Sequence, residues 1–201
     1  MPLLPLFPLD LVLLPGTALP LHIFEPRYKE MIAECRAKDT AFGIVRAVEN
    51  GIAEVGCTAG ITAVTKEYPD GRLDLVAEGR QRFEVMELNE ERSFLRAEVL
   101  MIPEELAPPV EADKIRAIEL HRQILTLAGA VQDLSGADDT LLSFHIAGSL
   151  PLDLDFKQKL LATRSERERM PILAEYLEQL LPNLQRAARV REKAGGNGHA
   201  R

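Results

Sequence analysis

The stretch Leu19–Tyr28 constrains the fold more than any other part of the chain, because a strand pattern changes there into a helix pattern. Leu19 to Phe24 alternate large apolar residues with Pro20 and His22, as a strand with one buried face requires. Pro20 cannot donate to a neighbouring strand, so we expect this strand at a sheet edge. Pro26 then suits the first turn of a helix. Apolar residues follow at helical spacing, at Tyr28, Met31, Ile32 and Cys35, and predict an amphipathic helix that fades near Asp39.

A second change of period divides the chain. Short apolar and β-branched runs alternate with turn signals up to Ile102, whereas the apolar residues repeat every 3.6 positions from Asp113 onward. The proline-rich segment between them has the composition of a linker. We therefore expect a β subdomain at residues 1–103, a linker at 104–112, a helical bundle at 113–193 and a disordered tail at 194–201.

The first half predicts short strands joined by tight turns, of which Asn50-Gly51 and Pro69-Asp70-Gly71 are the clearest. Together with the one early helix they indicate an α+β fold built on a partly closed, antiparallel-rich barrel. The expected strands are two within residues 1–18, then 19–24, 41–48, 52–58, 61–68, 72–78, 81–88 and 94–102.

The second half predicts four helices. The first carries its apolar stripe on Ala117, Leu120, Ile124, Leu127 and Val131. Asp138 or Asp139 can cap a second helix that runs to about Gly148, and Asp153 begins a third. Ser165 and Glu168 form a capping-box pattern for the last and longest helix. Within that helix, Pro171 and Pro182 are each expected to bend or interrupt it.

Several short motifs, spread along most of the chain, carry a resemblance to a known family. The N-terminal motifs are Pro5–Leu9, Leu14–Gly16, Leu19–Tyr28 with its Phe-Glu-Pro-Arg-Tyr ending, Phe42–Val45, Val55–Ala59 with Ile61, Asp70–Arg72 and Gly79–Phe83. The helical half adds Leu150–Leu152, Lys157–Leu161 and Arg169. Over about residues 3–182 the sequence resembles the Lon substrate-binding domain, which is the N-terminal domain of ATP-dependent Lon proteases.

This resemblance implies a PUA-like pseudo-barrel followed by a helical bundle, and a role in recognising unfolded or client polypeptides. A full Lon protease would continue into an ATPase domain and a peptidase domain with a Ser-Lys dyad. This sequence ends at Arg201 and contains no Gly-x-x-x-x-Gly-Lys-Ser/Thr phosphate loop. We therefore expect a stand-alone, non-catalytic form of the domain, with an ATP-dependent protease acting in trans as a further partner.

Composition narrows the classes of partner. The net charge of −7 argues against a partner that is bound mainly through its phosphates. Nucleic-acid binding by a PUA-like protein is therefore kept only as an alternative function. No apolar run approaches the roughly 18 residues of a membrane span, and Met1 to Val12 lack the basic start and small-residue cleavage site that a signal peptide would have. With only two cysteines, a reduced and cytoplasmic chain is expected. The apolar positions of the last helix also allow a weak homodimer.

The residues that carry chemistry in enzymes give little signal. His121 and His145 lie between apolar neighbours of predicted helices, and neither has a second ligand at metal spacing. His22 lies in the Leu19–Tyr28 motif between apolar residues. No serine stands in a Gly-x-Ser-x-Gly elbow. We therefore predict no catalytic residue, no metal and no cofactor, with a small-ligand pocket as an alternative to polypeptide binding.

The candidate polypeptide-binding residues are polar or aromatic side chains next to predicted strands. Glu25 and Arg27 could hold the backbone or terminus of a peptide; alternatively Glu25 caps the helix and Arg27 pairs across to the barrel, which the strand-to-helix corner favours. Arg80 and Arg82 could likewise be structural or could bind a peptide, and for these two the position at the start of a strand after Gly79 favours the lining of a groove slightly more than for Glu25 and Arg27. The full set is Phe24, Glu25, Arg27, Tyr28, Arg80 and Arg82.

Overall fold

A computed structural model of the chain describes residues 3–134 and 138–196. These residues form two compact units. Unit 1 contains the residues up to Glu104 together with Ala147–Arg164, and unit 2 contains Glu105–Ile146 and the residues from Ser165 onward. Residues 147–164, which the sequence grouped with the helices, thus belong to the unit that contains the sheet. The sequence-based linker at 104–112 stays a prediction.

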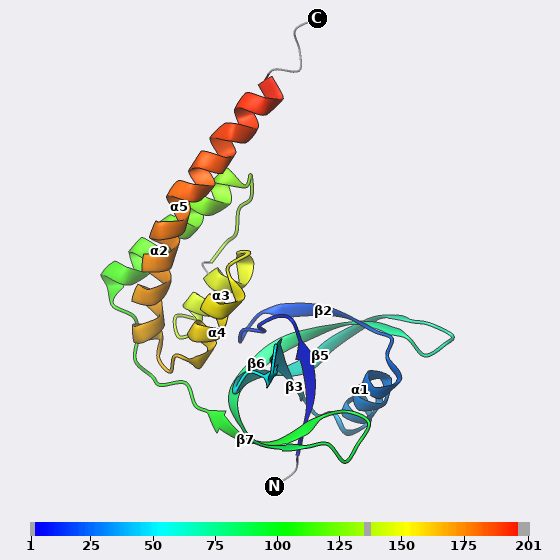
Figure 1. Cartoon of the computed structure of the whole chain (residues 1–201). Coiled ribbons are helices and arrows are strands. Elements are labelled where there is room, and N and C mark those ends of the chain that lie inside the picture. Colours follow the sequence, from blue (N-terminus) through cyan, green and yellow to red (C-terminus); the bar gives the residue numbers. More distant parts are fainter. Residues whose placement is uncertain (1–2, 135–137, 197–201) are drawn as a thin grey trace, which may run out of the picture. The chain divides into compact units, whose positions relative to one another are not determined.

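The strands of unit 1 close into a ring (Figure 1). Neighbours pair in the order β1, β7, β6, β5 and β3, and β1 pairs back with β3. Every pair in the ring is antiparallel except β1 with β3. The predicted antiparallel-rich barrel is therefore confirmed. The strands are β1 Leu4–Leu9, β2 Ala18–Ile23, β3 Phe42–Val48, β4 Gly51–Ile52, β5 Val55–Glu67, β6 Leu73–Asn89 and β7 Arg96–Ile102.

Two details of the strand prediction were wrong. Residues 10–17 form no strand, so only β1 precedes β2. The four short strands expected between residues 52 and 88 are two long ones, because β5 and β6 run without interruption for 13 and 17 residues. Register shifts between the two strands, one of them between Cys57 and Ala59, let each bend where the sequence suggested a break.

Helix α1, Pro26–Lys38, follows β2 as predicted. Its buried residues are Tyr28, Met31, Ile32 and Cys35, which is the stripe read from the sequence. The ring of Tyr28 packs on Phe7 of β1 in a tilted arrangement, with 4.0 Å between ring centroids and 31° between the ring planes. This helix is therefore fixed to the barrel through its first turn.

Helix α4, Leu154–Ala162, also belongs to unit 1. The carboxylate of Asp153 accepts hydrogen bonds from the backbone N–H groups of Asp155 and Phe156 at 2.9 and 3.1 Å, which confirms the predicted cap. Gln158 donates to the carbonyl of Val55 on β5 at 2.8 Å. The helix thereby lies against the outside of the sheet.

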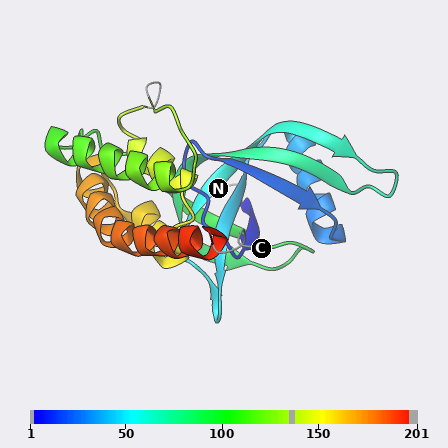
Figure 2. The same cartoon turned by 90° about the horizontal axis from the view of Figure 1, so that it is seen from above.

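Unit 2 is helical. Helices α2, Glu111–Leu127, and α5, Glu166–Gly196, pack side by side (Figures 1 and 2), and α3, Leu142–Ser149, begins in the same unit. Helix α2 ends at Leu127, and Gly129 takes the left-handed conformation (φ +68°) that commonly follows a helix. The stripe predicted as far as Val131 was therefore too long, and that side chain is 97% exposed.

Helix α5 begins with the predicted capping box, in which Ser165 and Glu168 exchange hydrogen bonds at 3.3 and 3.4 Å. It continues through Pro171 and Pro182, so of the two expected effects, a bend or an interruption, the interruption does not occur. Each proline removes only one backbone hydrogen bond. Between the two prolines, the buried side chains of Leu173 and Leu177 stabilise the helix through packing. The helix reaches Gly196, and the rest of the predicted tail lies outside the described residues.

Candidate binding groove

The strand-to-helix corner holds four of the predicted site residues. Phe24 is 57% exposed, whereas Tyr28 is buried. Arg27 pairs with Glu25 at 2.8 Å and lies over the ring of Tyr28, 4.6 Å from its centroid. The expected pairing of Arg27 across to the barrel is therefore replaced by a local pair. Glu25 occupies the N-cap position of α1, but its side chain makes no capping hydrogen bond.

A β-bulge decides where the other two predicted residues point. Gly79 of β6 lies opposite Ala59 and Arg82 opposite Cys57, so Arg80 and Gln81 both face the single residue Thr58. The hydroxyl of Thr58 closes the bulge: it donates to the carbonyl of Gln81 at 3.1 Å and accepts from its N–H at 3.0 Å. The normal alternation of side chains is broken here, and Arg80 and Arg82 have different environments.

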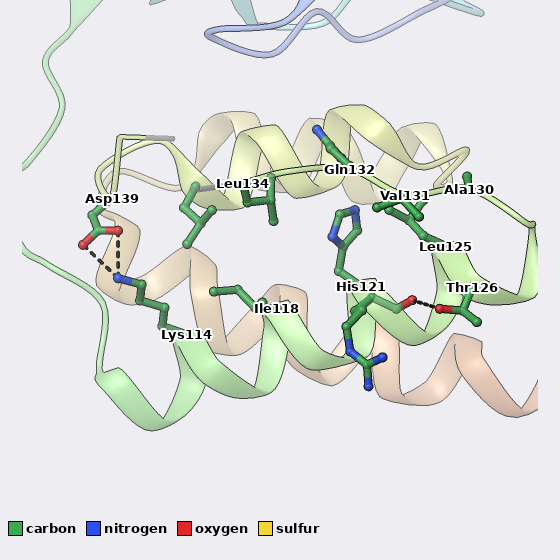
Figure 3. A pocket seen from close by; sticks show the side chains of 12 residues that line it. Lys114, Ile118, His121, Leu125, Thr126, Ala130, Val131, Gln132, Leu134 and Asp139 are labelled. Atoms are coloured by element: carbon green, nitrogen blue, oxygen red, sulfur yellow. Dashed lines mark hydrogen bonds and ion pairs between the residues drawn. The ribbon is translucent and has the colours of Figure 1, made fainter. Parts of the chain in front are cut away.

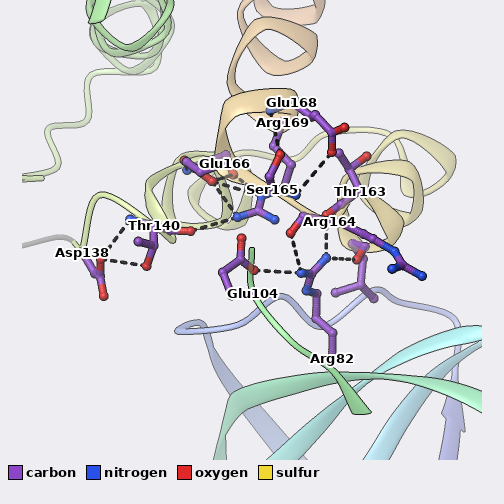
Figure 4. A network of polar contacts seen from close by, with 12 residues as sticks. Arg82, Glu104, Asp138, Thr140, Thr163, Arg164, Ser165, Glu166, Glu168 and Arg169 are labelled. Carbon is purple, nitrogen blue, oxygen red and sulfur yellow. Dashed lines mark hydrogen bonds and ion pairs between the residues drawn. The ribbon is translucent and has the colours of Figure 1, made fainter. Parts of the chain in front are cut away.

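Arg82 is 2% exposed and points to the C-terminal end of α4 (Figure 4). Its guanidinium donates to the backbone carbonyls of Leu161, Thr163 and Arg164 at 3.0, 2.5 and 3.0 Å. It also pairs with Glu104 at 2.8 Å. These contacts satisfy carbonyls that a helix end leaves without partners, so we place Arg82 outside the candidate binding surface.

Arg80, by contrast, is exposed and lies in the wall of a hollow of about 550 Å³ in unit 1. That volume falls within the roughly 300–1,000 Å³ of ligand pockets. Strands β1 and β7, together with Phe94 just before β7, supply much of the apolar part of its lining. The apolar side chains include Leu4, Pro5, Phe94, Val99 and Met101, of which Met101 is 42% exposed.

Two smaller hollows adjoin the large one. A hollow of about 390 Å³ shares Arg92 and Phe94 with it and is lined also by Arg27 and Tyr28. Another of about 200 Å³ shares Cys35, Thr40 and Arg80. We call these three adjoining hollows the barrel groove. Within it, Arg27 and Tyr28 of α1 line one hollow, and Arg80 of β6 lines the other two.

Ion pairs hold the rim of the barrel groove. Arg92 pairs with Glu30 at 2.5 Å and also with Glu34, and the hydroxyl of Ser93 donates to Glu30 at 2.5 Å. The bonds from Ser93 and Arg92 lower the pKa of Glu30 below its ordinary value, so this carboxylate stays ionised. Arg92 and Phe94 were not among the predicted site residues, because no local motif marks them and only the folded chain brings them to this surface.

The two cysteines are buried. Burial raises the pKa of the Cys35 thiol and raises that of Cys57 to about 12. Both are therefore protonated at neutral pH, although Cys35 lines the barrel groove, and neither has the thiolate character of a nucleophile.

Unit 2 contains a hollow of its own, of about 450 Å³, between α2 and the segment that follows it (Figure 3). Its wall is mainly apolar, and the ring of His121 points from α2 toward Val131 and Gln132. Burial lowers the pKa of His121, so the imidazole is neutral at pH 7. At one end Lys114 pairs with Asp139 at 2.8 Å.

A second buried network lies at the start of α5 (Figure 4). Arg169 and Glu166 are both 0% exposed and pair at 2.8 Å. Glu166 also accepts from the N–H and the hydroxyl of Ser143 at 2.7 Å each, and Arg169 donates to the carbonyl of Thr140 at 2.9 Å. Burial raises the pKa of Glu166, an effect that these bonds partly offset. The network joins α3 to α5 within unit 2.

Two chemical observations limit what the described residues can do. Among them, no group of three or more histidine, cysteine, aspartate or glutamate side chains is placed to hold a metal ion. No helix in the described ranges is long and apolar enough to cross a membrane.

The ring of strands and its groove define a class: mixed α/β proteins that carry a concave surface on a small, mostly antiparallel barrel. The chain belongs to the family of the ATP-dependent protease La (LON) substrate-binding domain, whose model matches residues 3–179. It is 26% identical to the Lon protease of Buchnera aphidicola subsp. Baizongia pistaciae over 94% of this chain and 26% of that protein. It is 33% identical to protein cereblon of Gallus gallus over 48% of this chain and 23% of that protein.

Solved structures agree with this family. A Lon N-terminal domain protein from Xanthomonas campestris superposes with a TM-score of 0.69 at 27% identity, covering 90% of this chain and 98% of that one. The N-terminal domain of Lon protease from the Mycobacterium avium complex has the same fold, with a TM-score of 0.63 at 20% identity, covering 88% and 98% of the two chains. The chain spans only about a quarter of the Buchnera protease, and the matching family model is that of a substrate-binding module.

Proposed function

We propose that this chain is a non-catalytic polypeptide-binding module whose binding surface is the barrel groove. The observation that carries this proposal is the convergence of Arg27, Tyr28 and Arg80 with the exposed side chain of Met101 on one concave surface. The first three were selected from sequence alone, from segments about fifty residues apart.

The lining suits an extended or unfolded polypeptide. Apolar side chains of β1 and β7 can accept side chains that a folded client would bury, and exposed apolar surface of this kind marks interaction sites. The rim supplies guanidinium groups that can donate to the carbonyl groups of an extended backbone. The Lon proteases among the relatives suggest that such clients could pass to an ATP-dependent protease in trans.

Binding should be measured by fluorescence anisotropy with a labelled polypeptide that carbamidomethylation of its cysteines keeps unfolded. The disulfide-bonded, folded form of the same polypeptide is the negative control. Met101→Asp is expected to weaken binding of the unfolded form about tenfold, because it places a charge on the apolar lining. Leu100→Asp is a matched control: Leu100 is the next residue of β7, is 56% exposed and is absent from the lining of the barrel groove.

Equal loss in both variants would place the binding surface elsewhere, and no binding by the unmodified chain would refute the proposal. Single-stranded RNA is the probe for the nucleic-acid alternative. Tight, salt-sensitive RNA binding would favour it, against the net charge of −7. The weak homodimer through α5 and the cytoplasmic location stay predictions.

A further inference from the structure

We propose that the barrel groove recognises the C-terminal carboxylate of a polypeptide that ends in an apolar residue, with Arg80 as the partner of the carboxylate. This inference rests on the proposed function and names the class of polypeptide that the groove prefers.

The charge state of the large hollow favours Arg80 as the partner of the carboxylate. Four cations line it: Lys38, Arg80, Arg92 and Arg96. Three of them already have acidic neighbours. The ammonium of Lys38 lies 3.7 Å from the carboxylate of Glu34. Arg92 pairs with Glu30, and the guanidinium of Arg96 lies 3.6 Å from the carboxylate of Glu91. Arg80 has no such partner within residues 3–134 and 138–196. It is therefore the cation available to a ligand anion.

The placement of Arg80 also suits a carboxylate ligand. The bulge opposite Thr58 directs Arg80 and Gln81 into the hollow together. The guanidinium lies directly against Gly60 of β5, where a β-carbon would come within 2.1 Å of Arg80 Cζ. The absence of a side chain at Gly60 thus makes room for a planar guanidinium against the strand. Such a group can bind a carboxylate through two parallel hydrogen bonds.

Apolar side chains lie in the same hollow as this charge. Phe94, Val99 and Met101 line the same hollow. A C-terminal residue presents a carboxylate and an apolar side chain on one α-carbon, so it can reach both the charge and the apolar lining. A segment rich in aspartate or glutamate would bring several charges toward a protein whose net charge is −7, which disfavours its approach.

The test uses two fluorescein-labelled ten-residue peptides of one sequence that ends in leucine, one with a free C-terminal carboxylate and one with an amide. The free acid is expected to bind the full chain about tenfold more tightly than the amide, as a charge-assisted hydrogen bond implies. Arg80→Gln should abolish this difference. Arg122→Gln, which removes an equal charge from an exposed pair on α2, should preserve it.

Gly60→Ala provides a second variant that keeps every charge. Its added methyl group displaces the Arg80 guanidinium, so it should also reduce the preference for the free acid. Circular dichroism and thermal melting would verify that each variant is folded. The carbamidomethylated unfolded polypeptide, with its C-terminus amidated, should bind all variants within about twofold of the unmodified chain.

The possible outcomes separate the two proposals. Equal binding of acid and amide, with retained binding of the unfolded polypeptide, would overturn the carboxylate inference and leave the proposed function intact. If the unmodified chain bound neither the peptides nor the unfolded polypeptide, both proposals would be overturned. Displacement of the free acid by millimolar inorganic phosphate, together with Arg80-dependent RNA binding, would assign the site to a phosphate ligand and also overturn the inference.

Discussion

Arg82 and Glu104 form an ion pair of 2.8 Å within unit 1, and the arginine is 2% exposed. The same guanidinium donates to backbone carbonyls at the end of α4. One side chain of β6 therefore joins the sheet to the helix that lies against it. Its neighbour two positions earlier, Arg80, lines the barrel groove, so β6 carries a structural and a candidate binding arginine side by side.

Replacing Arg82 should destabilise unit 1 strongly. Arg82→Met leaves Glu104 and the carbonyls at the end of α4 without their donor, which should lower the free energy of unfolding by roughly 3 kcal/mol. Arg82→Lys should recover only part of this, because an ammonium group cannot reproduce the planar fork. Urea unfolding followed by circular dichroism would measure both. Arg72→Met, at an exposed pair with Asp70, should change the free energy by less than about 1 kcal/mol; an equal loss there would contradict the assignment.

The different environments of Arg80 and Arg82 show where the sequence stops being informative. The strand pattern predicted that residues 81–88 form a strand, but alternation alone places residues 80 and 82 on one face. The bulge arises because Thr58, more than twenty residues earlier, bonds to both polar groups of the Gln81 backbone. Closure of the ring through β1 and β3 is likewise a non-local pairing that no local period reveals.

Thr58→Val tests the bulge. The variant keeps the shape of the side chain but removes both hydrogen bonds to Gln81, and should cost about 1–2 kcal/mol of unfolding free energy. Because Arg80 is aimed by the bulge, the variant should also weaken binding of the free-acid peptide. Thr62→Val is the matched control, since Thr62 on the same strand makes one bond, to the Val76 carbonyl, and is exposed. Unchanged peptide binding in a Thr58→Val variant of normal fold would argue that the bulge does not position Arg80.

Local signals predicted the helices better than the contacts between them. The Pro26 start of α1, the Asp153 cap and the Ser165–Glu168 box all depend on residues within one turn, and all are present. The continuity of α5 through Pro171 depends instead on the burial of Leu173 and Leu177. Tertiary burial thus outweighed a local rule in α5, whereas Arg27 pairs with the local residue Glu25 in place of the expected partner on the barrel.

Arg27 and Tyr28 should respond differently to replacement, although both line the barrel groove. Arg27 makes an exposed pair with Glu25, so Arg27→Ala should change stability by less than about 1 kcal/mol while weakening binding of unfolded polypeptide. Tyr28 is buried against Phe7, and Tyr28→Ala should cost roughly 3 kcal/mol or more. Thermal melting and anisotropy on the same samples would separate the two effects. A stable Tyr28→Ala variant would mean that α1 is not held through this packing.

Arg169 should control the pH dependence of unit 2. Burial already raises the pKa of Glu166, and Arg169→Met would remove the nearby positive charge and raise it further. A carboxyl group whose folded-state pKa is raised contributes stability below its unfolded pKa and loses it as pH rises through the folded value. The variant should therefore be destabilised more at pH 8 than at pH 5. Denaturant unfolding at the two values measures this, and Arg169→Met with Glu166→Gln should remove the difference; persistence of the difference would implicate another group.

His121 gives a pH effect of opposite sign. Burial lowers its pKa below the ordinary value of 6.5, so the neutral ring is the form that the folded state accepts. As pH falls below about 6.5 the unfolded chain takes up a proton that the folded chain resists, and stability is lost until the folded pKa is passed. The charged groups lining the same hollow are Lys114, Arg122 and Asp139, two of them positive, which adds to the cost of an imidazolium there.

We expect the melting temperature of the chain to decrease when the pH is lowered from 7 to 5. His121→Gln should make this decrease smaller, because glutamine does not titrate. His145→Gln is the matched control, since it removes a histidine of α3 that is only partly buried. Hydrogen exchange of the α2 amides would show whether the loss begins in unit 2. An identical fall in the His121→Gln variant would mean that carboxyl groups, rather than this imidazole, set the acid stability of the helices.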